Sequence, residues 1–483
     1  MALSVRQLEP SSLWNYFADL NAVPRPSKKE ARVIQFMLEF GKKLGLPTSV
    51  DKVGNVLIQK PATQGLEHKP VVLLQSHLDM VHQKNAETQF DFDKEGIKMK
   101  VEGDWVSAEG TTLGADNGIG VASIMAILAS DKIAHPPIEA LFTIDEETGL
   151  TGAKGLEGGI LQAKYMLNLD TEDDRELTIG CAGGVDVTGE GNYRQEPLPN
   201  GMKAFRLGIS GLTGGHSGMD IHLSRGNANK LCNRLLAGGA SSFGLRIATV
   251  DGGSLRNAIP RECFATVLVP TEKSNDFLKY IETETAALHA EYRTTDPELT
   301  VLCDETSNPS EVMVSSFQKT WLATIYACAN GIYRMSPDVD DLVQTSNNLS
   351  RVLAKDGQFS IQCLTRGSVD SEKMDLANAL KATMELAGAN VRFGNEYPGW
   401  TPNPNSHLVT LLSSIFEEMN QSKPHVYACH AGLECGIVGQ NYPDMEMISF
   451  GPNIRGAHSP DEKVQISSVQ KYWEFLLRTL KSL

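Results

Sequence analysis

Apolar residues in the first part of the chain follow two patterns that together predict an α/β fold. Short stretches of strand length that are rich in apolar residues are typical of buried strands, and they cover residues 53–59, 71–75, 138–144 and 165–169. Segments typical of helices, with apolar residues at helical spacing or rich in small apolar residues, cover residues 12–17, 29–44 and 117–129. Strands and helices that alternate in this way favour a mainly parallel sheet flanked by helices.

The same alternation returns near the end of the chain, after a long region of different character. Residues 445–450 are strand-like, and residues 467–483 have the pattern of an amphipathic helix. The region between twice presents a strand, a polar loop and a helix; the segments are 202–212 with 227–236, and 357–367 with 371–387. We therefore expect a first domain made of residues 1–184 and 400–483. Residues 185–399 would be inserted in it as an α+β lid domain of two β-α-β-type repeats.

The composition is that of an ordinary globular protein, and its charge argues against two classes of partner. The chain has 483 residues, 41% of them hydrophobic, and a formal net charge of −15. Such a surface repels phosphate backbones and anionic lipids, so we expect no nucleic-acid partner and no membrane partner. No apolar run approaches the ~20 residues of a membrane span, and the first residues lack a signal-peptide core. The eight cysteines contain no C-x-x-C pair, which favours reduced thiols in a cytoplasmic protein.

Several predicted strands end in side chains that coordinate metal ions. These side chains are His77 and Asp79 after the run 71–75, Asp145, Glu146 and Glu147 after 138–144, Asp170 after 165–169, and His458 after 445–450. A further carboxylate, Asp116, directly precedes the helix 117–129. In parallel α/β sheets, ligands collect beyond the carboxyl ends of the strands. We therefore expect these residues to converge although they are far apart in the sequence.

The chemistry of this set fits a pair of divalent ions. Two histidines with several carboxylates suit Zn²⁺, with Mn²⁺ or Co²⁺ as substitutes. Two ions ~3.5–4 Å apart need a bridging carboxylate and a shared water, and one further carboxylate must stay free to accept the proton of that water. Glu146 and Glu147 can divide these roles, because neighbouring side chains on an extended segment point to different sides.

Each motif also has a purely structural explanation when it is taken alone. An H-x-D tripeptide is commonly a surface or capping element, and a pair of glutamates is commonly a solvated face. The sequence Asp116-Asn117-Gly118 fits a turn with an N-cap for the next helix. What favours the metal site is that all of these residues lie at strand ends or helix starts within a single α/β pattern.

The motifs S-H-L-D-M, G-A-D-N-G-I-G, D-E-E-T-G, L-N-L-D and A-H-S-P-D-E occur in this order along the chain. This order resembles the co-catalytic dizinc peptidases and amidohydrolases, a family that includes carnosinases, tripeptidase T and aminoacylase-1. The resemblance covers nearly the whole length, and it implies a zinc exopeptidase-like fold. The phrases GGHSGMDIH, SLRNAIPRE and CHAGLECG resemble those members of the family that cleave Xaa-His dipeptides.

The resemblance also implies a role for each residue at the strand ends. The metal ligands would be His77 and Asp170 for one zinc, Glu147 and His458 for the other, and Asp116 as the bridge between them. Asp79 would orient His77, as such histidine ligands usually require. Glu146 would be the general base. The peptide bond between Asp116 and Asn117 would be cis.

In the lid and after it, the resemblance points to substrate contacts. His216, in a glycine-rich turn, would stabilise the oxyanion, in the family often across a dimer interface. Arg366 would bind the substrate carboxylate with its guanidinium fork, and Asn257 would be a second contact from the lid. Gly432 and Glu434 would lie near the pocket, where Glu434 is a candidate for binding the free amine of a dipeptide.

The function implied by these correspondences is that of a metallodipeptidase with two Zn²⁺ ions per chain and a Glu general base. Its expected substrates are Xaa-His dipeptides, including carnosine-like ones, and its expected partner is a second copy of the chain bound through the lid. Two alternatives keep the same site: a broader di- or tripeptidase, and an N-acyl amino acid hydrolase. A third alternative is a non-catalytic binding protein, but such proteins usually lose a ligand or the base, and here every position is filled.

Overall fold

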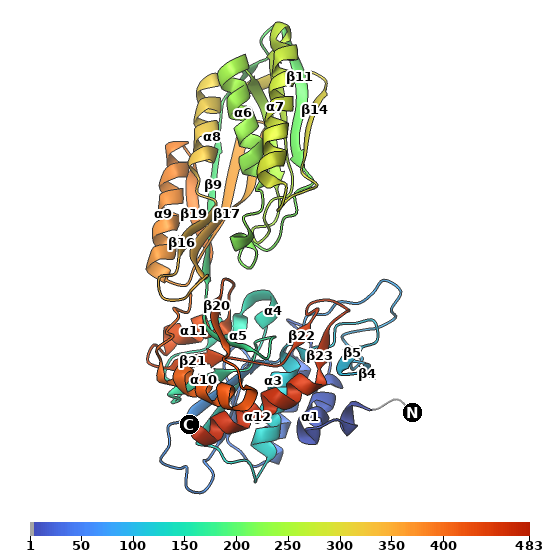
Figure 1. Cartoon of the computed structure of the whole chain (residues 1–483), viewed down its shortest axis with the longest axis vertical. Helices are drawn as coiled ribbons and strands as arrows, with labels where there is room; N and C mark the ends of the chain where they lie inside the picture. The colour runs from blue at the N-terminus through green and yellow to red at the C-terminus, as the bar shows by residue number, and fades with distance from the viewer. Residues whose placement is uncertain (1–3) are drawn as a thin grey trace. The chain divides into compact units, whose positions relative to one another are not determined.

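The computed structural model describes residues 4–483 and divides into two compact units (Figure 1). The first unit contains the chain up to Gly180, Trp400–Ala428 and Leu433–Leu483, and the second contains Cys181–Gly399 and Cys429–Gly432. The sequence placed residues 181–184 and 429–432 in the first domain, so these two boundaries differ from the prediction. Both segments are joined by backbone hydrogen bonds, because the amide of Ala182 donates to the carbonyls of Cys429 and Ala431.

An eight-stranded sheet forms the centre of the first unit. Its strands, in spatial order, are β1 (Thr48–Val50), β2 (Val56–Lys60), β6 (Ile138–Thr143), β3 (Val72–His77), β7 (Tyr165–Asn168), β21 (Glu446–Ser449), β8 (Glu176–Cys181) and β20 (His425–Cys429). The four inner strands β6, β3, β7 and β21 run parallel, as the apolar runs predicted. Strands β1, β2 and β8 pair antiparallel with their neighbours.

Helices flank this sheet, and one of them is almost entirely buried. The helices of the unit are η1 (Val5–Gln7), α1 (Ser11–Asn21), α2 (Ala31–Lys43), α3 (Ala115–Ala129), α4 (Glu146–Gly149), α5 (Thr151–Gly155), α10 (His407–Asn420), α11 (Glu434–Asn441) and α12 (Ile466–Ser482). A helix that is apolar all round is expected in a core, and α3 packs beside β3. A Cβ at Gly120 would lie 2.4 Å from Ser76 Oγ, so this close approach requires glycine.

The register of the parallel strands brings their carboxyl ends to one edge. His77 is paired with Thr143 of β6, and Asn168 of β7 is paired with Ser449 of β21. The residues that follow these strands therefore leave the sheet at the same level. A small four-stranded sheet completes the unit, in the order β22 (Ile454–Arg455), β23 (Lys463–Gln465), β5 (Trp105–Ala108) and β4 (Met99–Glu102).

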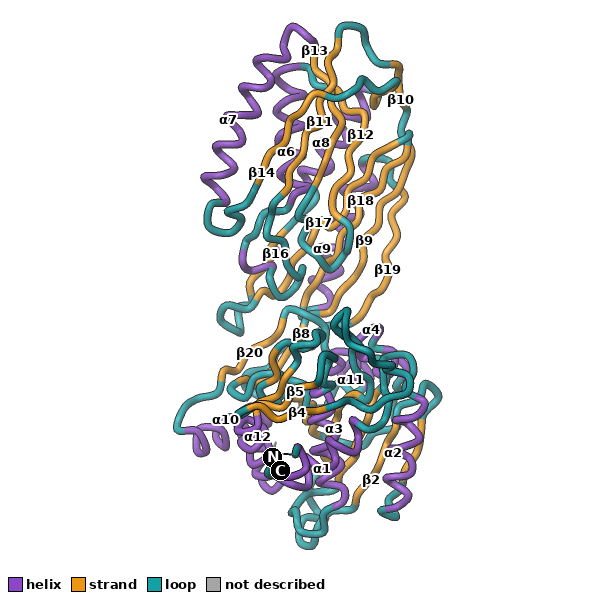
Figure 2. The backbone as a smooth tube through the Cα atoms, turned by 90° about the vertical axis from the view of Figure 1, so that its right-hand side faces the viewer, coloured by secondary structure: helices purple, strands orange, loops and turns teal. Residues whose placement is uncertain are grey.

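The second unit is built on a nine-stranded antiparallel sheet (Figure 2). Its strands, in spatial order, are β14 (Thr300–Glu305), β11 (Met202–Ser210), β13 (Cys263–Pro270), β12 (Arg246–Gly253), β17 (Val343–Lys355), β18 (Gln358–Gly367), β9 (Gly183–Asn192) and β19 (Asn390–Tyr397), with β16 (Gly331–Met335) also paired to β17. A separate antiparallel pair joins β10 (Gln195–Pro197) and β15 (Glu311–Met313).

Four helices cover one face of this sheet (Figures 1 and 2). They are α6 (Ala228–Phe243), α7 (Ser274–Tyr292), α8 (Ser315–Ala327) and α9 (Asp370–Leu386), with short turns η2 (Ile221–Leu223) and η3 (Thr271–Lys273). The predicted strand-loop-helix segments correspond to β11 with α6 and to β18 with α9. Among residues 4–483, no helix combines the length and the apolar character that a bilayer span needs.

Candidate metal centre

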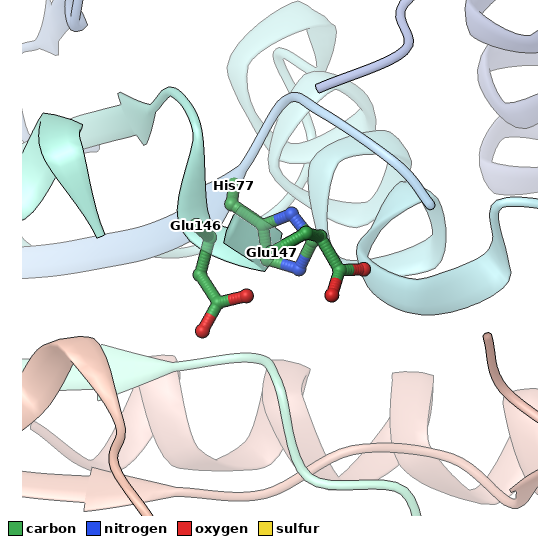
Figure 3. A group of neighbouring side chains, drawn as sticks. All are labelled: His77, Glu146 and Glu147. Atoms are coloured by element: carbon green, nitrogen blue, oxygen red, sulfur yellow. The ribbon is translucent and has the colours of Figure 1, made fainter. Parts of the chain in front are cut away.

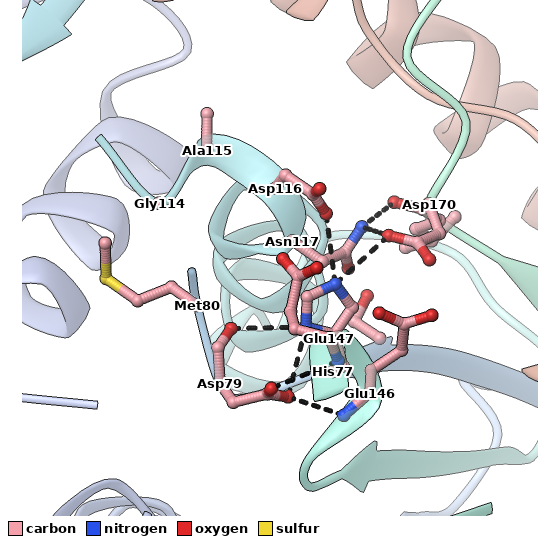
Figure 4. A network of polar contacts seen from close by, with 12 residues as sticks. His77, Asp79, Met80, Gly114, Ala115, Asp116, Asn117, Glu146, Glu147 and Asp170 are labelled. Atoms are coloured by element: carbon pink, nitrogen blue, oxygen red, sulfur yellow. Dashed lines mark hydrogen bonds and ion pairs between the residues drawn. The ribbon is translucent and has the colours of Figure 1, made fainter. Parts of the chain in front are cut away.

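Five side chains from distant parts of the chain meet at the carboxyl edge of the first unit's sheet. Figure 4 shows His77, Asp116, Glu147 and Asp170 among them. The five side chains form two overlapping groups, and within each group the ligand atoms lie within 4.8 Å of one another; the groups are His77, Asp116 and Asp170, and Asp116, Glu147 and His458. These are the five residues that the sequence assigned to metal binding. Asp116 belongs to both groups.

The two groups meet at the two oxygens of the Asp116 carboxylate. His77 Nε2 lies 3.0 Å from Asp116 Oδ1 and 3.4 Å from Asp170 Oδ1. His458 Nε2 lies 3.2 Å from Asp116 Oδ2 and 2.9 Å from Glu147 Oε2. In a tetrahedral site with bonds of about 2.0–2.2 Å to nitrogen and oxygen, neighbouring ligand atoms lie roughly 3.3–3.6 Å apart. The observed separations are close to this spacing, so the residues fit a pair of ions that share Asp116.

The electrostatics of the group also fit a cation site. Glu147 Oε1 is buried and has no hydrogen-bond partner within residues 4–483. Burial raises the pKa of Glu147 and of Asp170, and the nearby carboxylate of Asp116 raises both further. The carboxylates of Asp116 and Glu147 raise the pKa of His458 to about 11. Without a cation, the His458 ring therefore keeps at pH 7 a proton that a metal ion would replace.

Asp79 contacts the ring nitrogen of His77 that does not face Asp116. Its Oδ1 lies 3.4 Å from His77 Nδ1, which leaves Nε2 of the same ring directed at Asp116. The Asp79 carboxylate also accepts hydrogen bonds from the backbone amides of Glu146, at 3.0 Å, and Glu147, at 3.3 Å. Asp79 thus fixes one ligand ring and the start of α4 together.

Glu146 and Glu147 lie on a short helix and not on the extended segment that the sequence predicted. Helix α4 begins at Glu146, and Asp145 before it has a left-handed φ of 49°. Successive residues of a helix are separated by about 100° around its axis, so the two side chains still point in different directions (Figure 3). Burial, together with the nearby carboxylates of Asp170 and Glu434, raises the pKa of Glu146 well above its ordinary value.

The peptide bond between Asp116 and Asn117 is cis, as predicted. Both residues have non-helical backbone angles, so the regular part of α3 starts after them. The Asn117 side-chain amide donates to the carbonyl of Leu169, at 2.7 Å, and to the carboxylate of Asp170. Asn117, which directly follows Asp116, therefore ties the start of α3 to the end of β7, where Asp170 lies.

Glu434 lies buried beside the centre, at the start of α11. Its Oε2 accepts hydrogen bonds from Gln75 Nε2, at 2.6 Å, and from the Thr143 hydroxyl, at 2.7 Å. Its Oε1 is buried without a partner in the part of the chain that the structure describes. Burial raises the pKa of Glu434 to about 7, and the field of Asp170 adds to this. The sequence indicated Glu434 near the pocket but did not predict its strand partners.

In the second unit, the predicted residue His216 lies in a turn that defines its tautomer. Its Nδ1 accepts hydrogen bonds from the backbone amides of Gly218, at 3.2 Å, and Met219, at 3.0 Å. The ring proton is therefore on Nε2, which is the donor that oxyanion binding requires. Burial lowers the pKa of His216, with a contribution from Arg366, so the ring is neutral at pH 7.

Arg366, in β18, is buried and held by an aromatic hydroxyl. Its Nη1 donates to the Tyr397 hydroxyl at 2.8 Å, and its Nε has no hydrogen-bond partner among the described residues. Gly432 lies against the same tyrosine, because a Cβ there would be 3.0 Å from Tyr397 Cε2. Asn257 is exposed, and its carbonyl accepts from the Ser217 amide at 2.8 Å.

Several buried polar residues near these sites were missed by the sequence analysis. They are Arg25, Ser27, Gln75, Ser346, His430 and Glu462, and the half-buried Tyr397 was missed as well. His430 Nε2 lies 2.7 Å from the Ser346 hydroxyl, and burial lowers the pKa of His430 to about 3. Glu462 and His430 had a signal in the sequence, since Glu462 ends the motif A-H-S-P-D-E and His430 lies in the phrase CHAGLECG.

Comparisons with known proteins agree over nearly the whole chain. The family model described as "Peptidase family M20/M25/M40" matches residues 73–482. The cytosol non-specific dipeptidase of Escherichia coli strain K12 is 42% identical over 477 residues, which cover 99% of this chain and 98% of that protein.

Solved structures show the same fold. The crystal structure of aminoacylhistidine dipeptidase from Vibrio alginolyticus matches with a TM-score of 0.95 and 42% identity, covering 100% of this chain and 98% of that one. Aminopeptidase PepT from Bacillus cereus matches with a TM-score of 0.57 and 17% identity, covering 98% of each chain. These matches confirm the α/β fold class that the sequence predicted.

Proposed function

This chain belongs to peptidase family M20/M25/M40, a family of hydrolases that act on peptide bonds, and we propose that it is a metal-dependent dipeptidase for unblocked Xaa-His dipeptides. The observation that carries the proposal is the position of Asp116, whose two oxygens face His77 and His458 separately. Two relatives that are 42% identical to the chain bear names of dipeptidases, one non-specific and one for aminoacylhistidine.

The ligand set supports two zinc ions, with Mn²⁺ or Co²⁺ as substitutes, because it offers two imidazoles and three carboxylates. His77 and Asp170 would hold one ion, His458 and Glu147 the other, and Asp116 both. Two ions bound there would lower the pKa of a water molecule between them and polarise the scissile carbonyl.

Glu146 acts as the general base in this proposal. It accepts the proton of the attacking water and returns it to the leaving amine. The raised pKa of Glu146 supports the second transfer. A carboxyl group with a raised pKa holds its proton longer, so it can act as the general acid that delivers the proton to the leaving amine. Asp79 keeps the backbone of Glu146 in place through its 3.0 Å hydrogen bond.

Glu434 binds the free amine of the substrate. Its buried, unpaired Oε1 is an acceptor without a partner in the described part of the chain, and an ammonium group is the donor that such an oxygen favours. Gly432 lies two residues before Glu434, and because it has no side chain it adds no bulk beside the backbone that leads to Glu434.

Residues of the second unit supply the remaining substrate contacts in this proposal. His216 donates from Nε2 to the developing oxyanion, and Arg366 binds the substrate carboxylate through its guanidinium group. Asn257 is a further contact. The support for these roles is that Nδ1 of His216 is already occupied as an acceptor and that Arg366 is buried with an unpaired Nε among the described residues.

A panel of substrates tests the proposal against its nearest alternatives. The purified protein, loaded with Zn²⁺, is assayed with Xaa-His dipeptides, other dipeptides, tripeptides and N-acetyl amino acids, and kcat/KM is compared. Preference for Xaa-His dipeptides is the expected result. Equal rates on most dipeptides would support the broader dipeptidase, which the name of the Escherichia coli relative favours. Preference for N-acetyl amino acids, or activity that a chelator leaves intact, would refute the proposal.

We also propose a homodimer formed through the second unit, and a cytoplasmic location. The dimer is supported by the family resemblance, and sedimentation equilibrium tests it directly. The location is supported by the name of the Escherichia coli relative, which contains the word cytosol. Cell fractionation with an antibody against the protein would test it.

A further inference from the structure

We infer that Glu462 and Arg25 form a buried clamp that fixes the backbone around Asp116 and thereby sets the metal affinity of the centre. The inference rests on the proposed function, because it concerns the ions that the centre would hold. Neither residue is a predicted ligand, and both act as positioning residues.

Glu462 is buried and binds four consecutive backbone amides. Its Oε2 accepts from Leu113 at 2.7 Å and Gly114 at 2.8 Å, and its Oε1 accepts from Ala115 at 2.7 Å and Asp116 at 3.2 Å. Hydrogen bonds to an ionised carboxylate are shorter and stronger than those between neutral groups. One side chain therefore fixes the peptide units that lead into the bridging carboxylate.

Arg25 binds the same segment through a carbonyl. Its Nη2 donates to the carbonyl of Gly114 at 2.6 Å, while its Nη1 donates to the carbonyls of Leu78 and Asp79, both at 3.1 Å. Leu78 directly follows His77. The rigid guanidinium fork thus joins the backbone beside one histidine ligand to the backbone beside the shared carboxylate.

Gly114 is the point where the two halves of the clamp meet. Its amide is bound by Glu462 and its carbonyl by Arg25. Its φ is +70°, in the left-handed region, and a Cβ there would lie 2.5 Å from Arg25 Nη2. The segment therefore passes close to the guanidinium group only because this residue has no side chain.

Glu462 also belongs to the segment that carries the second histidine ligand. It follows His458 by four residues, and the intervening turn is closed by a 3.1 Å hydrogen bond from the Glu462 amide to the Ser459 carbonyl. The contact of Glu462 with the Asp116 backbone therefore connects His458 to the carboxylate that it faces. Groups that orient metal ligands in this way typically change metal affinity by about 10–100-fold when they are altered.

A second buried glutamate provides a matched control. Glu139 is also 2% exposed and also accepts backbone amides, from Gln162 at 2.9 Å and Ala163 at 3.1 Å. It lies near the start of β6, whereas Glu146 and Glu147 follow the other end of that strand. Replacing it removes the same kind of hydrogen bonds without touching a ligand segment.

The test is a titration of the metal-free protein with Zn²⁺ in competition with a chromophoric chelator. The variants are Glu462→Gln, Glu462→Asp, Arg25→Lys and Glu139→Gln, and the thermal midpoint of each metal-free form is recorded. We expect Glu462→Gln to weaken binding by about 10–100-fold, Arg25→Lys to weaken it in the same direction, and Glu462→Asp to recover part of the loss. Glu139→Gln is expected to bind Zn²⁺ like the unchanged protein even where its thermal midpoint falls.

Unchanged affinity in Glu462→Gln would overturn the inference, as would an equal loss in Glu139→Gln. If Glu462→Gln does not fold, unchanged affinity in both Arg25→Lys and Glu462→Asp would overturn it in the same way. Failure of the unchanged protein to bind two ions would refute the proposed function instead, so the two failures are distinguishable.

Discussion

His77 and His458 face different oxygens of one carboxylate, that of Asp116. Nε2 of His77 lies 3.0 Å from Oδ1, and Nε2 of His458 lies 3.2 Å from Oδ2. A carboxylate placed between two imidazoles in this way has the geometry that a bridge between two divalent ions requires. The two histidines come from opposite ends of the chain, so the fold itself assembles the centre.

Replacing Glu146 by glutamine is expected to abolish turnover and leave metal binding intact. The amide cannot accept the proton of the attacking water, and loss of a general base typically costs about 10²–10⁴-fold in kcat. Steady-state kinetics and elemental analysis of bound zinc measure the two effects on the same sample. Glu139→Gln is the matched control, with kcat expected to be unchanged. Retention of more than about one per cent of kcat in Glu146→Gln would show that another group is the base.

Replacing Asp79 by asparagine is expected to weaken metal binding by about 10–100-fold. The change removes the carboxylate that faces His77 Nδ1 and weakens the hydrogen bonds to the amides of Glu146 and Glu147. Zinc titration of the metal-free variant gives the affinity. Ser27→Ala is a suitable comparison, because it removes the 2.8 Å hydrogen bond from the Ser27 hydroxyl to Asp79, and a 3.2 Å one to the Met80 carbonyl, and leaves the Asp79 carboxylate in place. Equal effects of the two substitutions would contradict the role of Asp79 in orienting the ligand.

Replacing Glu434 by glutamine is expected to lower kcat/KM for free dipeptides and to spare N-acetylated ones. Loss of a hydrogen bond to a charged group costs about 1.5–3 kcal/mol, which corresponds to roughly 10–150-fold. Both substrate classes are assayed with the unchanged protein and the variant. A uniform loss for both classes would indicate a structural role for Glu434.

The same substitution has a predicted effect on stability against pH. Burial raises the pKa of Glu434 in the folded protein to about 7, above its ordinary value of 4.5. A raised pKa contributes stability that is fully present below the unfolded pKa and is lost as pH rises through the folded pKa. Glutamine resembles the protonated acid, so the variant should gain in thermal midpoint relative to the unchanged protein between pH 4.5 and pH 8. Parallel midpoint curves over this range would contradict the prediction.

Loading the metal-free protein with Zn²⁺ at pH 7 is expected to release protons. Hydrogen bonds to Asp116 and Glu147 raise the pKa of His458 to about 11, so this ring is protonated in the metal-free protein and must lose its proton to bind an ion. The raised pKa stabilises the metal-free fold fully below pH 6.5, the ordinary value, and less as pH rises through 11. Calorimetric titration in two buffers of different ionisation enthalpy measures the release. Identical enthalpies in both buffers would rule it out.

The fold and the convergence of the strand-end side chains could be predicted from the sequence because both depend on local patterns. Each inner strand is rich in apolar residues, and His77 and Asp170 appear where such a stretch stops. The parallel arrangement then brings the strand ends to one edge, which makes the convergence predictable without coordinates. The conformation of Glu146 and Glu147 was not predictable in this way, because a single helical turn of four residues leaves no periodicity to detect.

Asp79 aside, the contacts by which buried polar residues position the centre could not be found from the sequence, for a physical reason. Glu462 binds amides that precede it by more than 340 positions, and Gln75 binds Glu434, which is 359 positions away. A buried polar side chain must find a partner, but nothing in the local sequence says which one. Arg25 is a similar case, because a lone arginine before a proline resembles an ordinary surface residue.

Residues Cys429–Gly432 belong to the second unit although they are far in sequence from the rest of it, and this limits how the protein can be divided into fragments. A recombinant fragment with the 219 residues of Cys181–Gly399 alone would omit the strand-like stretch whose carbonyls receive the Ala182 amide, and it would omit His430, which faces Ser346. The inserted region is therefore not a transferable module with a single point of entry and exit. Chimeras built by exchanging it between relatives should carry both pieces from the same parent.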